Sequence, residues 1–435
     1  MSVPNTLEAK IRANRLLHLP VDWRDEMIFP AFDGLSILNA SATLGAALGV
    51  DAGMPLDSAV WQGESPLEKV DRVVLIISDG LGYLWLKRLI AEDPMIAGLV
   101  ADLSGGRPPV PLTSIAPSTT AVALPTLYSA SAPATHGMLG TLMNLYPLHT
   151  IVDMLSMSSV IGGQMGNITQ WGINPTQLIE GQMLPEKLGA AGVPVHLVIE
   201  RALMGSGIST VLHRGISDFH GFIKFSDWAM RLRAALKQTA GKRALVVTYW
   251  DGVDSLSHTY GAKSDEVRHE IRTQLTLLRD ALARPEGRDG RTLVMLLADH
   301  GHHDAPTDID LSQTPAGQHI LDAMRGTFTG DQRFAYLHLR DGQTPSVVDA
   351  LKATYSESLV WFTPSEGLAA GVFGRGEVHR HFAHRAGDLI VTPRLGSKLA
   401  YPLQPSDPRR IHTPISVHAG LSDWEMLVPM LWHTL

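Results

Sequence analysis

The chain has 435 residues, of which 45% are hydrophobic and 18% charged, with a formal net charge of −7. This length predicts about two to four domains and enough apolar side chains for a large core. The acidic balance, without a basic stripe of interleaved aromatic residues, argues against nucleic-acid polymers and anionic membranes as partners. The chain contains no cysteine, which excludes disulfides and thiolate-bound metals and leaves carboxylates and imidazoles as metal ligands.

The first residues are polar and lack the basic and apolar regions of a secretion signal. No apolar stretch of about 20 residues predicts a transmembrane segment. We therefore expect a cytoplasmic protein. We also expect residues 1–70 to form an N-terminal segment that precedes a catalytic domain at 71–435.

Strands and helices alternate along the predicted domain. Strands are expected at 72–78, 110–115, 243–250, 292–298, 334–339 and 388–392, with a βα-like piece at 193–199, and helices at 83–91, 120–130, 227–237 and 264–283. The runs at 72–78, 243–250 and 292–298 are continuously apolar, which is typical of central strands in a parallel sheet buried on both faces. The alternation predicts an α/β fold with a mainly parallel sheet. The less regular range at about 140–240 is expected to be an insertion that caps the site.

One stretch is unusually poor in charge. Between Pro108 and Ile179 the only Asp, Glu, Lys or Arg is Asp153. Prolines and small polar residues interrupt the stretch, so it is expected to lie mostly buried against the sheet. The alternative is that its methionines line an apolar substrate pocket or a homo-oligomer interface, because methionine surfaces adapt to varied shapes. These methionines are Met143, Met154, Met157 and Met165.

Acidic and imidazole side chains follow all three central strands. In parallel sheets, ligands bind beyond the carboxyl ends of the strands, so these side chains predict a hydrolytic metal site. The candidate ligands are Asp79, Asp254, His258, Asp299, His300 and His418. Asp254 and His258 are four residues apart, so on a helix both side chains point the same way. Gly80 and Gly301 directly follow candidate ligands and allow the backbone to approach a bound group closely.

A hydroxyl nucleophile is suggested by the sequence APSTTAVAL at 116–124. Ser118 or Thr119 is expected to cap the helix that begins at Thr120. A hydroxyl at a helix N-terminus lies where free N–H groups and the helix dipole stabilise an alkoxide or a phosphate. Simple capping of the helix is the alternative interpretation.

Taken together, these blocks resemble the type I phosphodiesterase/nucleotide pyrophosphatase family of the alkaline phosphatase superfamily. The matching blocks, in order along the chain, are IISDGLG at 76–82, PSTTAVALPTLYSASAPATHGMLG at 117–140, WDGVDSLSHTYG at 250–261, ADHGHHD at 298–304 and HAGLSDWEMLVPML at 418–431. The resemblance implies an alkaline-phosphatase-like three-layer sandwich. It also implies hydrolysis of a phosphodiester or pyrophosphate bond in a small phosphate ester.

The resemblance further implies two divalent metal ions, usually zinc, although such sites also accept manganese. One ion would be bound by Asp79, Asp299, His300 and the nucleophile, and the other by Asp254, His258 and His418. Members of the family place the nucleophile sixteen residues before the histidine of a His-Gly pair. Counting back from His136 gives Thr120, with Thr119 as the alternative. Thr120 would then form a phosphothreonine intermediate.

The chain departs from the family's nucleotide-cleaving members at two positions. Ala123 stands where these members commonly carry an asparagine that holds a phosphate oxygen, and Ala121 stands where an aromatic residue clamps the base. Both departures count against a nucleotide substrate. A formylglycine sulfatase is excluded, because the chain has no cysteine and no serine in the Cys/Ser-x-Pro-x-Arg setting.

Three alternatives to a phosphodiesterase remain. A phosphomonoesterase and a phosphonate hydrolase belong to the same superfamily, and a non-catalytic metal-binding relative would keep the fold without turnover.

Several other polar residues are not expected to bind metal directly. Asp251 is a candidate acceptor for a ligand imidazole. His302, His303 and Asp304 either orient the Asp-His pair or lie in a solvated loop. A polar surface loop is expected to contain His379, His381 and His384.

Overall fold

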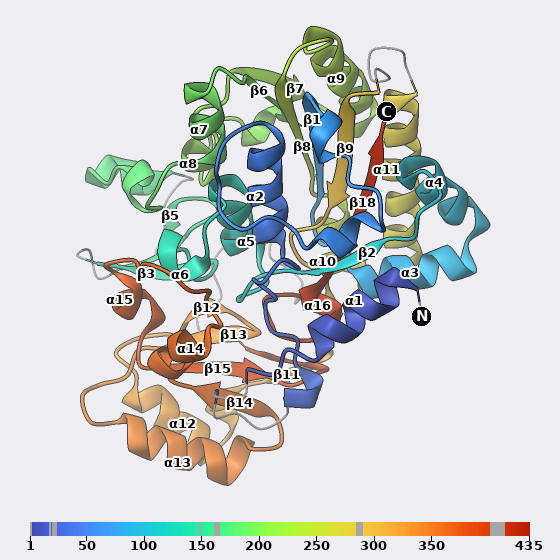
Figure 1. The fold of residues 1–435 in the computed structure, drawn as a ribbon. Coiled ribbons are helices and arrows are strands. Elements are labelled where there is room, and N and C mark those ends of the chain that lie inside the picture. Colours follow the sequence, from blue (N-terminus) through green and yellow to red (C-terminus); the bar gives the residue numbers. More distant parts are fainter. Residues whose placement is uncertain are drawn as a thin grey trace.

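The structure is a computed structural model with an α/β core and a smaller second lobe (Figure 1). It describes residues 2–16, 19, 24–146, 148, 150–160, 166–283, 290–400 and 414–435.

The core is built on a seven-stranded sheet in the order β2–β18–β9–β1–β8–β6–β7. Its strands are β1 (Arg72–Ser78), β2 (Val110–Thr113), β6 (Val195–Glu200), β7 (Asp218–Phe222), β8 (Ala244–Trp250), β9 (Thr292–Leu297) and β18 (Leu427–Thr434). The five strands from β9 to β7 run parallel, whereas β18 pairs antiparallel with both β9 and β2. Every residue of β1 and β9 is buried, which is expected of central strands covered on both faces.

Helices cover both faces of this sheet (Figure 1). One group, joined by mutual contacts, comprises α3 (Tyr83–Glu92), α4 (Pro94–Ser104), α9 (Phe225–Gln238), α10 (Gly252–Tyr260) and α11 (Asp265–Leu282). The other comprises α2 (Ile37–Ala47), α5 (Thr120–Ser129), α7 (Leu184–Ala190) and α8 (Ser209–Leu212). The short helices α1 (Val3–Arg12), α6 (Pro133–His136) and α16 (Asp423–Met426) complete the core. This arrangement confirms the predicted three-layer α/β sandwich.

The second lobe contains another seven-stranded sheet, in the order β14–β15–β13–β12–β3–β4–β5, with antiparallel pairing throughout. Its strands are β3 (Leu142–Leu145), β4 (Thr150–Asp153), β5 (Ser158–Ser159), β12 (Thr329–Asp331), β13 (Phe334–Leu337), β14 (Leu359–Phe362) and β15 (Leu389–Pro393). The lobe's helices are α12 (Pro315–Ala323), α13 (Thr344–Tyr355), α14 (Pro364–Ala370) and α15 (Phe382–Ala386). A separate apolar cluster beneath α12 and α13 forms its core.

The described residues also form two small two-stranded sheets. β10 (His303–Asp304) pairs antiparallel with β17 (Ser416–Val417). β11 (Thr307–Ile309) pairs in parallel with β16 (Ser397–Leu399). The β10–β17 pair brings the segment after β9 beside the segment that carries His418.

The range 140–240 is divided between the two large sheets. Its first part supplies β3–β5 to the second lobe, but β6 and β7 belong to the central sheet. Strand β7 was not expected, because it is an edge strand with the sequence DFHGF, is mostly not buried and lacks the apolar run of a central strand. Within residues 1–70, α2 packs on α5 and shares the main core.

The charge-poor stretch is largely buried, as expected. All ten residues of α5 are buried. Met143, Met154 and Met157 belong to the main apolar core, so they do not line an open pocket. Met165 lies outside the described residues. No helix in the described ranges is both long and apolar enough to cross a membrane.

A buried ion pair joins the second lobe to the loop that follows His418. The guanidinium of Arg333 donates to both carboxylate oxygens of Glu425, at 2.6 and 2.9 Å, and the two side chains are 1% and 0% exposed. Glu425 also accepts hydrogen bonds from Gly420 N and from the Ser422 backbone and hydroxyl. Burial alone would raise the pKa of Glu425, but Arg333 and these donors lower it to about 2.

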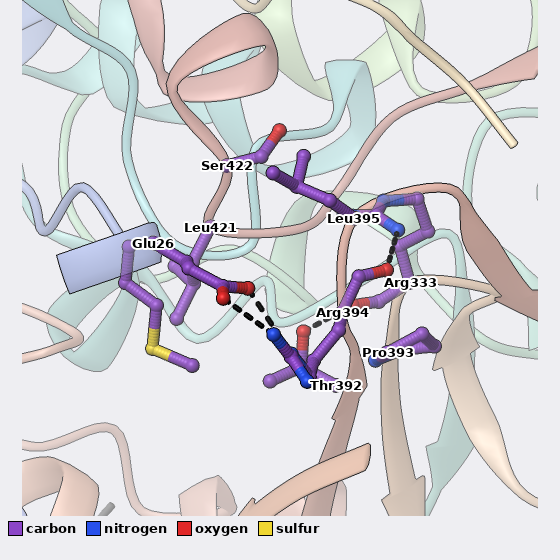
Figure 2. A pocket seen from close by; sticks show the side chains of 9 residues that line it. Glu26, Arg333, Thr392, Pro393, Arg394, Leu395, Leu421 and Ser422 are labelled. Atoms are coloured by element: carbon purple, nitrogen blue, oxygen red, sulfur yellow. Dashed lines mark hydrogen bonds and ion pairs between the residues drawn. The ribbon is translucent and has the colours of Figure 1, made fainter. Parts of the chain in front are cut away.

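Arg333 also lines a small pocket beside this pair. Figure 2 shows Arg333 donating to the Arg394 carbonyl, while Arg394 bonds Glu26 from the N-terminal segment. Three distant parts of the chain therefore meet at one pair of arginines.

We predict that Glu425→Gln destabilises the protein by about 3–5 kcal/mol at pH 7, because it leaves the buried Arg333 charge without a partner. The folded-state pKa of Glu425 is depressed, so its stabilisation exists above the ordinary value of 4.5 and is lost as the pH falls toward about 2. Urea unfolding between pH 7 and 3.5 should show the difference between wild type and variant shrinking below about pH 4.5. The exposed Glu357 is the control, and Glu357→Gln should change stability by less than about 0.5 kcal/mol.

Candidate active site

Three carboxylates gather where neighbouring strands of the central sheet end. Asp79 directly follows β1, Asp299 lies just after β9, and Asp254 lies in the first turn of α10, which follows β8. Because β9, β1 and β8 are adjacent and parallel, their carboxyl ends meet at one edge. The structure therefore brings together the side chains that sequence reasoning selected.

The first group surrounds Thr120, the first residue of α5. Its hydroxyl oxygen lies 3.4 Å from each carboxylate oxygen of Asp79 and 3.0 Å from His300 Nε2. His300 Nε2 is also 3.2 Å from Asp79 Oδ1 and 3.5 Å from Asp299 Oδ2. The four predicted members of this group are therefore mutual neighbours.

The second group surrounds Asp254. Its Oδ1 lies 3.5 Å from His258 Nε2 and 3.6 Å from His418 Nε2. His258 is one turn further along α10, as the four-residue spacing predicted. The closest imidazole, however, is that of His302, whose Nε2 is 2.7 Å from the same oxygen. One ligand atom from each of these four residues fits within 4.8 Å of the others.

The two groups form one continuous cluster. Ligand atoms of Asp79, Asp254 and His300 also lie within 4.8 Å of one another. The rings of His300 and His418 stack with centroids 4.0 Å apart. The site thus presents two neighbouring sets of carboxylate and imidazole ligands.

Backbone contacts fix the orientation of two imidazoles. His258 Nδ1 is 2.8 Å from the Ser416 carbonyl, and His300 Nδ1 is 3.1 Å from the Gly301 carbonyl. A carbonyl can only accept, so both Nδ1 atoms carry a proton, and each Nε2 faces the site. Asp299 Oδ1 accepts from the backbone N–H groups of Gly80 and His300.

Burial and neighbouring like charges act in the same direction on Asp79. Burial, followed by the charges of Asp299 and Asp254, raises its pKa well above the usual range. Burial would also raise the pKa of Asp254, but the surrounding imidazoles hold it well below its usual value. Burial and the neighbouring His300 lower the pKa of His418, so its ring is neutral at pH 7.

These residues fit divalent cations. The ligand set is carboxylate and imidazole, which suits zinc and related metals. Asp299 Oδ2 and His418 Nδ1 are buried and make no hydrogen bond within the described part of the chain. A positive charge would also relieve the repulsion that raises the pKa of Asp79.

Two contacts in the cluster were not predicted from the sequence. Tyr249, in β8, donates a hydrogen bond from its hydroxyl to Asp79 Oδ2. His302 was left between two interpretations, and the structure buries it against Asp254 with its Nδ1 on the Ser416 hydroxyl. The order His300-Gly301-His302 was the available signal, since a short loop after a strand can turn both rings inward.

The remaining secondary residues have structural contacts. His303 accepts from Gly396 N, and Asp304 accepts from Ala262 N. Burial raises the pKa of Asp251 to about 6, and no hydrogen bond to a ligand imidazole is found for it among the described residues.

The expectation of a polar surface loop was wrong for His379, which is only 3% exposed. The neighbouring Arg385 is equally buried, and its guanidinium donates to the carbonyls of Gly137 and Leu178. This arginine ties the loop down beside α6. His384 remains exposed and stacks on Tyr146.

The model of the type I phosphodiesterase/nucleotide pyrophosphatase family matches residues 73–415. The match spans most of the chain, which therefore belongs to this family of phosphoester hydrolases. A comparison with curated protein sequences found no significant match.

Solved structures with the same fold include murine ectonucleotide pyrophosphatase/phosphodiesterase 5, with a TM-score of 0.59 and 15% identity over 83% of this chain and 87% of that one. Phosphonoacetate hydrolase from Sinorhizobium meliloti, in complex with phosphonoformate, has a TM-score of 0.58 and 15% identity over 84% of this chain and 90% of that one. At these identities the likeness shows the alkaline-phosphatase-like fold.

We predict that Gly80→Ala damages the site and destabilises the protein. Gly80 has φ +77°, and an added Cβ would lie 2.9 Å from Asp254 Cα and from His302 Cδ2. The left-handed backbone alone should cost about 1–3 kcal/mol for alanine. The variant should unfold at a lower temperature and should hydrolyse a phosphate ester more slowly. Gly98→Ala is the control, because its Cβ would meet open space on α4, and unchanged behaviour of Gly80→Ala would contradict the prediction.

Proposed function

We propose that the protein hydrolyses a small phosphodiester or pyrophosphate with two divalent metal ions and a phosphothreonine intermediate on Thr120. The observation that carries this proposal is the position of the Thr120 hydroxyl. It lies within 3.4 Å of both Asp79 carboxylate oxygens and 3.0 Å from His300 Nε2. A role in helix capping alone would not explain why the Thr120 hydroxyl contacts a cluster of carboxylates and imidazoles.

The start of α5 supports a bound phosphate. Thr119 occupies the N-cap position, as predicted, but its side chain makes no capping hydrogen bond. Its hydroxyl lies 3.2 Å from that of Thr141 instead. The first N–H groups of the helix are therefore not taken by the expected cap, and they favour an anion beside Thr120.

We propose that Asp79, Thr120, Asp299 and His300 hold one metal ion, and that Asp254, His258 and His418 hold the other. His302 is a further candidate, because it lies closest to Asp254. Zinc is the expected ion, and manganese suits the same ligand types. When bound, the ions would neutralise phosphate charge and favour the ionised form of the nucleophile.

The residues of the chain then have distinct roles in the proposed reaction. Thr120 Oγ1 bonds to phosphorus in line with the leaving oxygen, which departs with the proton that Thr120 loses. Water then breaks the phosphothreonine bond, giving a phosphate product and restoring the Thr120 hydroxyl. Asp79 and His300 orient Thr120 through their direct contacts, and the Tyr249 hydroxyl orients Asp79. Positioning and charge stabilisation account for most catalysis in phosphoryl transfer.

Two similar structures bear on the substrate. One is an inactive variant of the murine protein, in which alanine replaces a threonine, in complex with AMP. In this chain, Ala121 and Ala123 are fully buried and offer neither an aromatic face nor an amide. We therefore propose a leaving group other than a nucleoside. Hydrolysis of a phosphonate is the second candidate, because the structure of phosphonoacetate hydrolase is about as similar.

We further propose that the second lobe selects the substrate. Thr141 N donates to the buried Asp331 carboxylate of β12, and the Thr141 hydroxyl contacts Thr119 beside the nucleophile. Thr141, which directly precedes β3, and Asp331 of β12 therefore lie next to the start of α5.

We predict that Thr120→Ala lowers kcat at least about 1,000-fold, because it removes the nucleophile. The assay compares bis-p-nitrophenyl phosphate, p-nitrophenyl phosphate and phosphonoacetate, with zinc or manganese supplied. Thr119→Ala is the matched control and should keep activity within about tenfold. Faster diester hydrolysis that Thr120→Ala alone abolishes would agree with the proposal. Full activity of Thr120→Ala would contradict it, and a preference for the monoester or the phosphonate would select one of the alternative activities.

We also predict that metal removal abolishes activity and destabilises the protein. Restoring metal at a hundredfold excess over its Kd should stabilise the fold by about 2.7 kcal/mol per site. The effect of Asp79→Asn on the melting temperature should have opposite signs with and without metal. Without metal it relieves the repulsion from Asp254 and Asp299 and raises the melting temperature, whereas with metal it weakens binding and lowers it. Calorimetric melting with and without EDTA measures both effects, and identical shifts in the two conditions would contradict the proposed ligand.

A further inference from the structure

A second cluster of metal-binding side chains lies on the two outermost strands at the β7 edge of the central sheet. His196 is on β6, and Asp218 and His220 are on β7. The Cα partner of His196 in the parallel pairing is Asp218. Side chains two residues apart on a strand share a face, so all three side chains lie on the same face.

This cluster is remote from the candidate active site. His196 is the second residue of β6 and Asp218 the first of β7, so the cluster belongs to the amino-terminal end of these strands. The active-site carboxylates lie beyond the carboxyl ends of β1, β8 and β9. Figure 1 likewise shows β7 and α9 at one end of the core and α10 nearer the second lobe.

The distances suit one small cation. His196 Nδ1 is 3.1 Å from His220 Nε2, and Asp218 Oδ2 is 4.0 Å and 3.8 Å from these two nitrogens. A point about 2.1 Å from all three atoms satisfies these distances, and zinc lies about 2.0–2.2 Å from nitrogen and carboxylate oxygen ligands. The ligand atoms therefore need little movement to bind an ion.

The surroundings favour metal-binding forms of the side chains. His196 is only 5% exposed, and burial lowers the pKa of both His196 and His220, so each imidazole is neutral at pH 7. Gln238 on α9 donates to Asp218 Oδ2, and Phe219 N donates to Oδ1, which holds the carboxylate in place. Lys242 and Arg231 are near enough to lower the pKa of His196 and His220 respectively. Their positive charges oppose the binding of a cation, but neither is a member of the three-residue cluster.

We propose that His196, Asp218 and His220 form a third metal site, which binds one zinc-like transition metal ion and completes its coordination with water. Because β7 is the edge strand and, among the residues that the structure describes, pairs with β6 alone, the ion would tie the edge of the sheet to its neighbour. The site is independent of the proposed catalytic activity. Without metal, the two imidazoles share a hydrogen bond.

The test measures how many zinc ions the purified full chain retains after equilibrium dialysis, for wild type and His220→Gln. Glutamine keeps an amide near the Nε2 position but is a poor zinc ligand. Wild type should retain one more zinc ion per chain than the variant. Added zinc should raise the melting temperature of wild type more than that of the variant. Cobalt titration should give a corresponding difference in visible absorption. The phosphate-ester hydrolysis rate should be the same in both, which separates this site from the catalytic one.

His269→Gln is the matched control, because His269 is an exposed histidine on α11 and should not change the zinc count. Asp218→Asn provides a second variant, which preserves the hydrogen bond from Phe219. It should lower the affinity for the additional zinc ion at least tenfold. Urea unfolding without metal verifies that each variant is folded. Equal zinc content and equal cobalt spectra in wild type, His220→Gln and Asp218→Asn would overturn the proposal.

Discussion

The repulsion among three closely spaced carboxylates, two of them buried, is the constraint on which the rest of the candidate active-site region depends. Ligand atoms of Asp79 and Asp254 lie within 4.8 Å of each other, and two such charges repel by about 3–4 kcal/mol at an effective dielectric constant near 20. Three imidazoles surround Asp254, whereas Asp79 has one neighbouring imidazole, that of His300, and the hydroxyl of Tyr249. A proton or a cation among these carboxylates would lessen the repulsion. Burial, followed by the charges of Asp299 and Asp254, raises the pKa of Asp79 well above its usual range.

The surrounding fold holds these groups together from several directions. Ser118 and Ala419 exchange backbone hydrogen bonds, and the Ser118 hydroxyl donates to Gly420 O. The helix carrying Thr120 is thereby tied to the loop carrying His418. The buried Glu425 organises the same loop from its other side, through Gly420, Ser422 and Arg333. Segments distant in sequence are thus fixed relative to one another by buried hydrogen bonds.

The sequence predicted the central strands and most ligand positions because their signals are local. Apolar runs at β1, β8 and β9 end on acidic residues, and parallel strands place their carboxyl ends together. The four-residue spacing of Asp254 and His258 carried over to α10 without change.

The parts that sequence reasoning missed depend on long-range pairing. Nothing near Glu425 indicates that its partner is Arg333, which lies 92 residues earlier. Strand β7 is a polar edge strand, so its place in the central sheet follows from pairing with β6 rather than from its own pattern. His379 was assigned to the surface because of its charged neighbours, yet Arg385 is buried by bonding two backbone carbonyls. Tertiary contacts override local polarity in each case.

The arrangement of α5 indicates where substrate selection must occur. Every residue of this helix is buried, so its body has no free face for a leaving group, and only its N-terminal end reaches the ligand cluster. The next polar contacts outward run from Thr119 to Thr141 and on to Asp331. Burial raises the pKa of Asp331 to about 6, so a modest change in its surroundings would alter its charge. Under the proposed function, this carboxyl is the candidate second-lobe group for contact with a substrate bound at Thr120. In the proposed arrangement the nucleophile and ligands come from the central core and the selecting groups from the second lobe, while Arg333 and Glu425 couple the second lobe to the loop that carries His418.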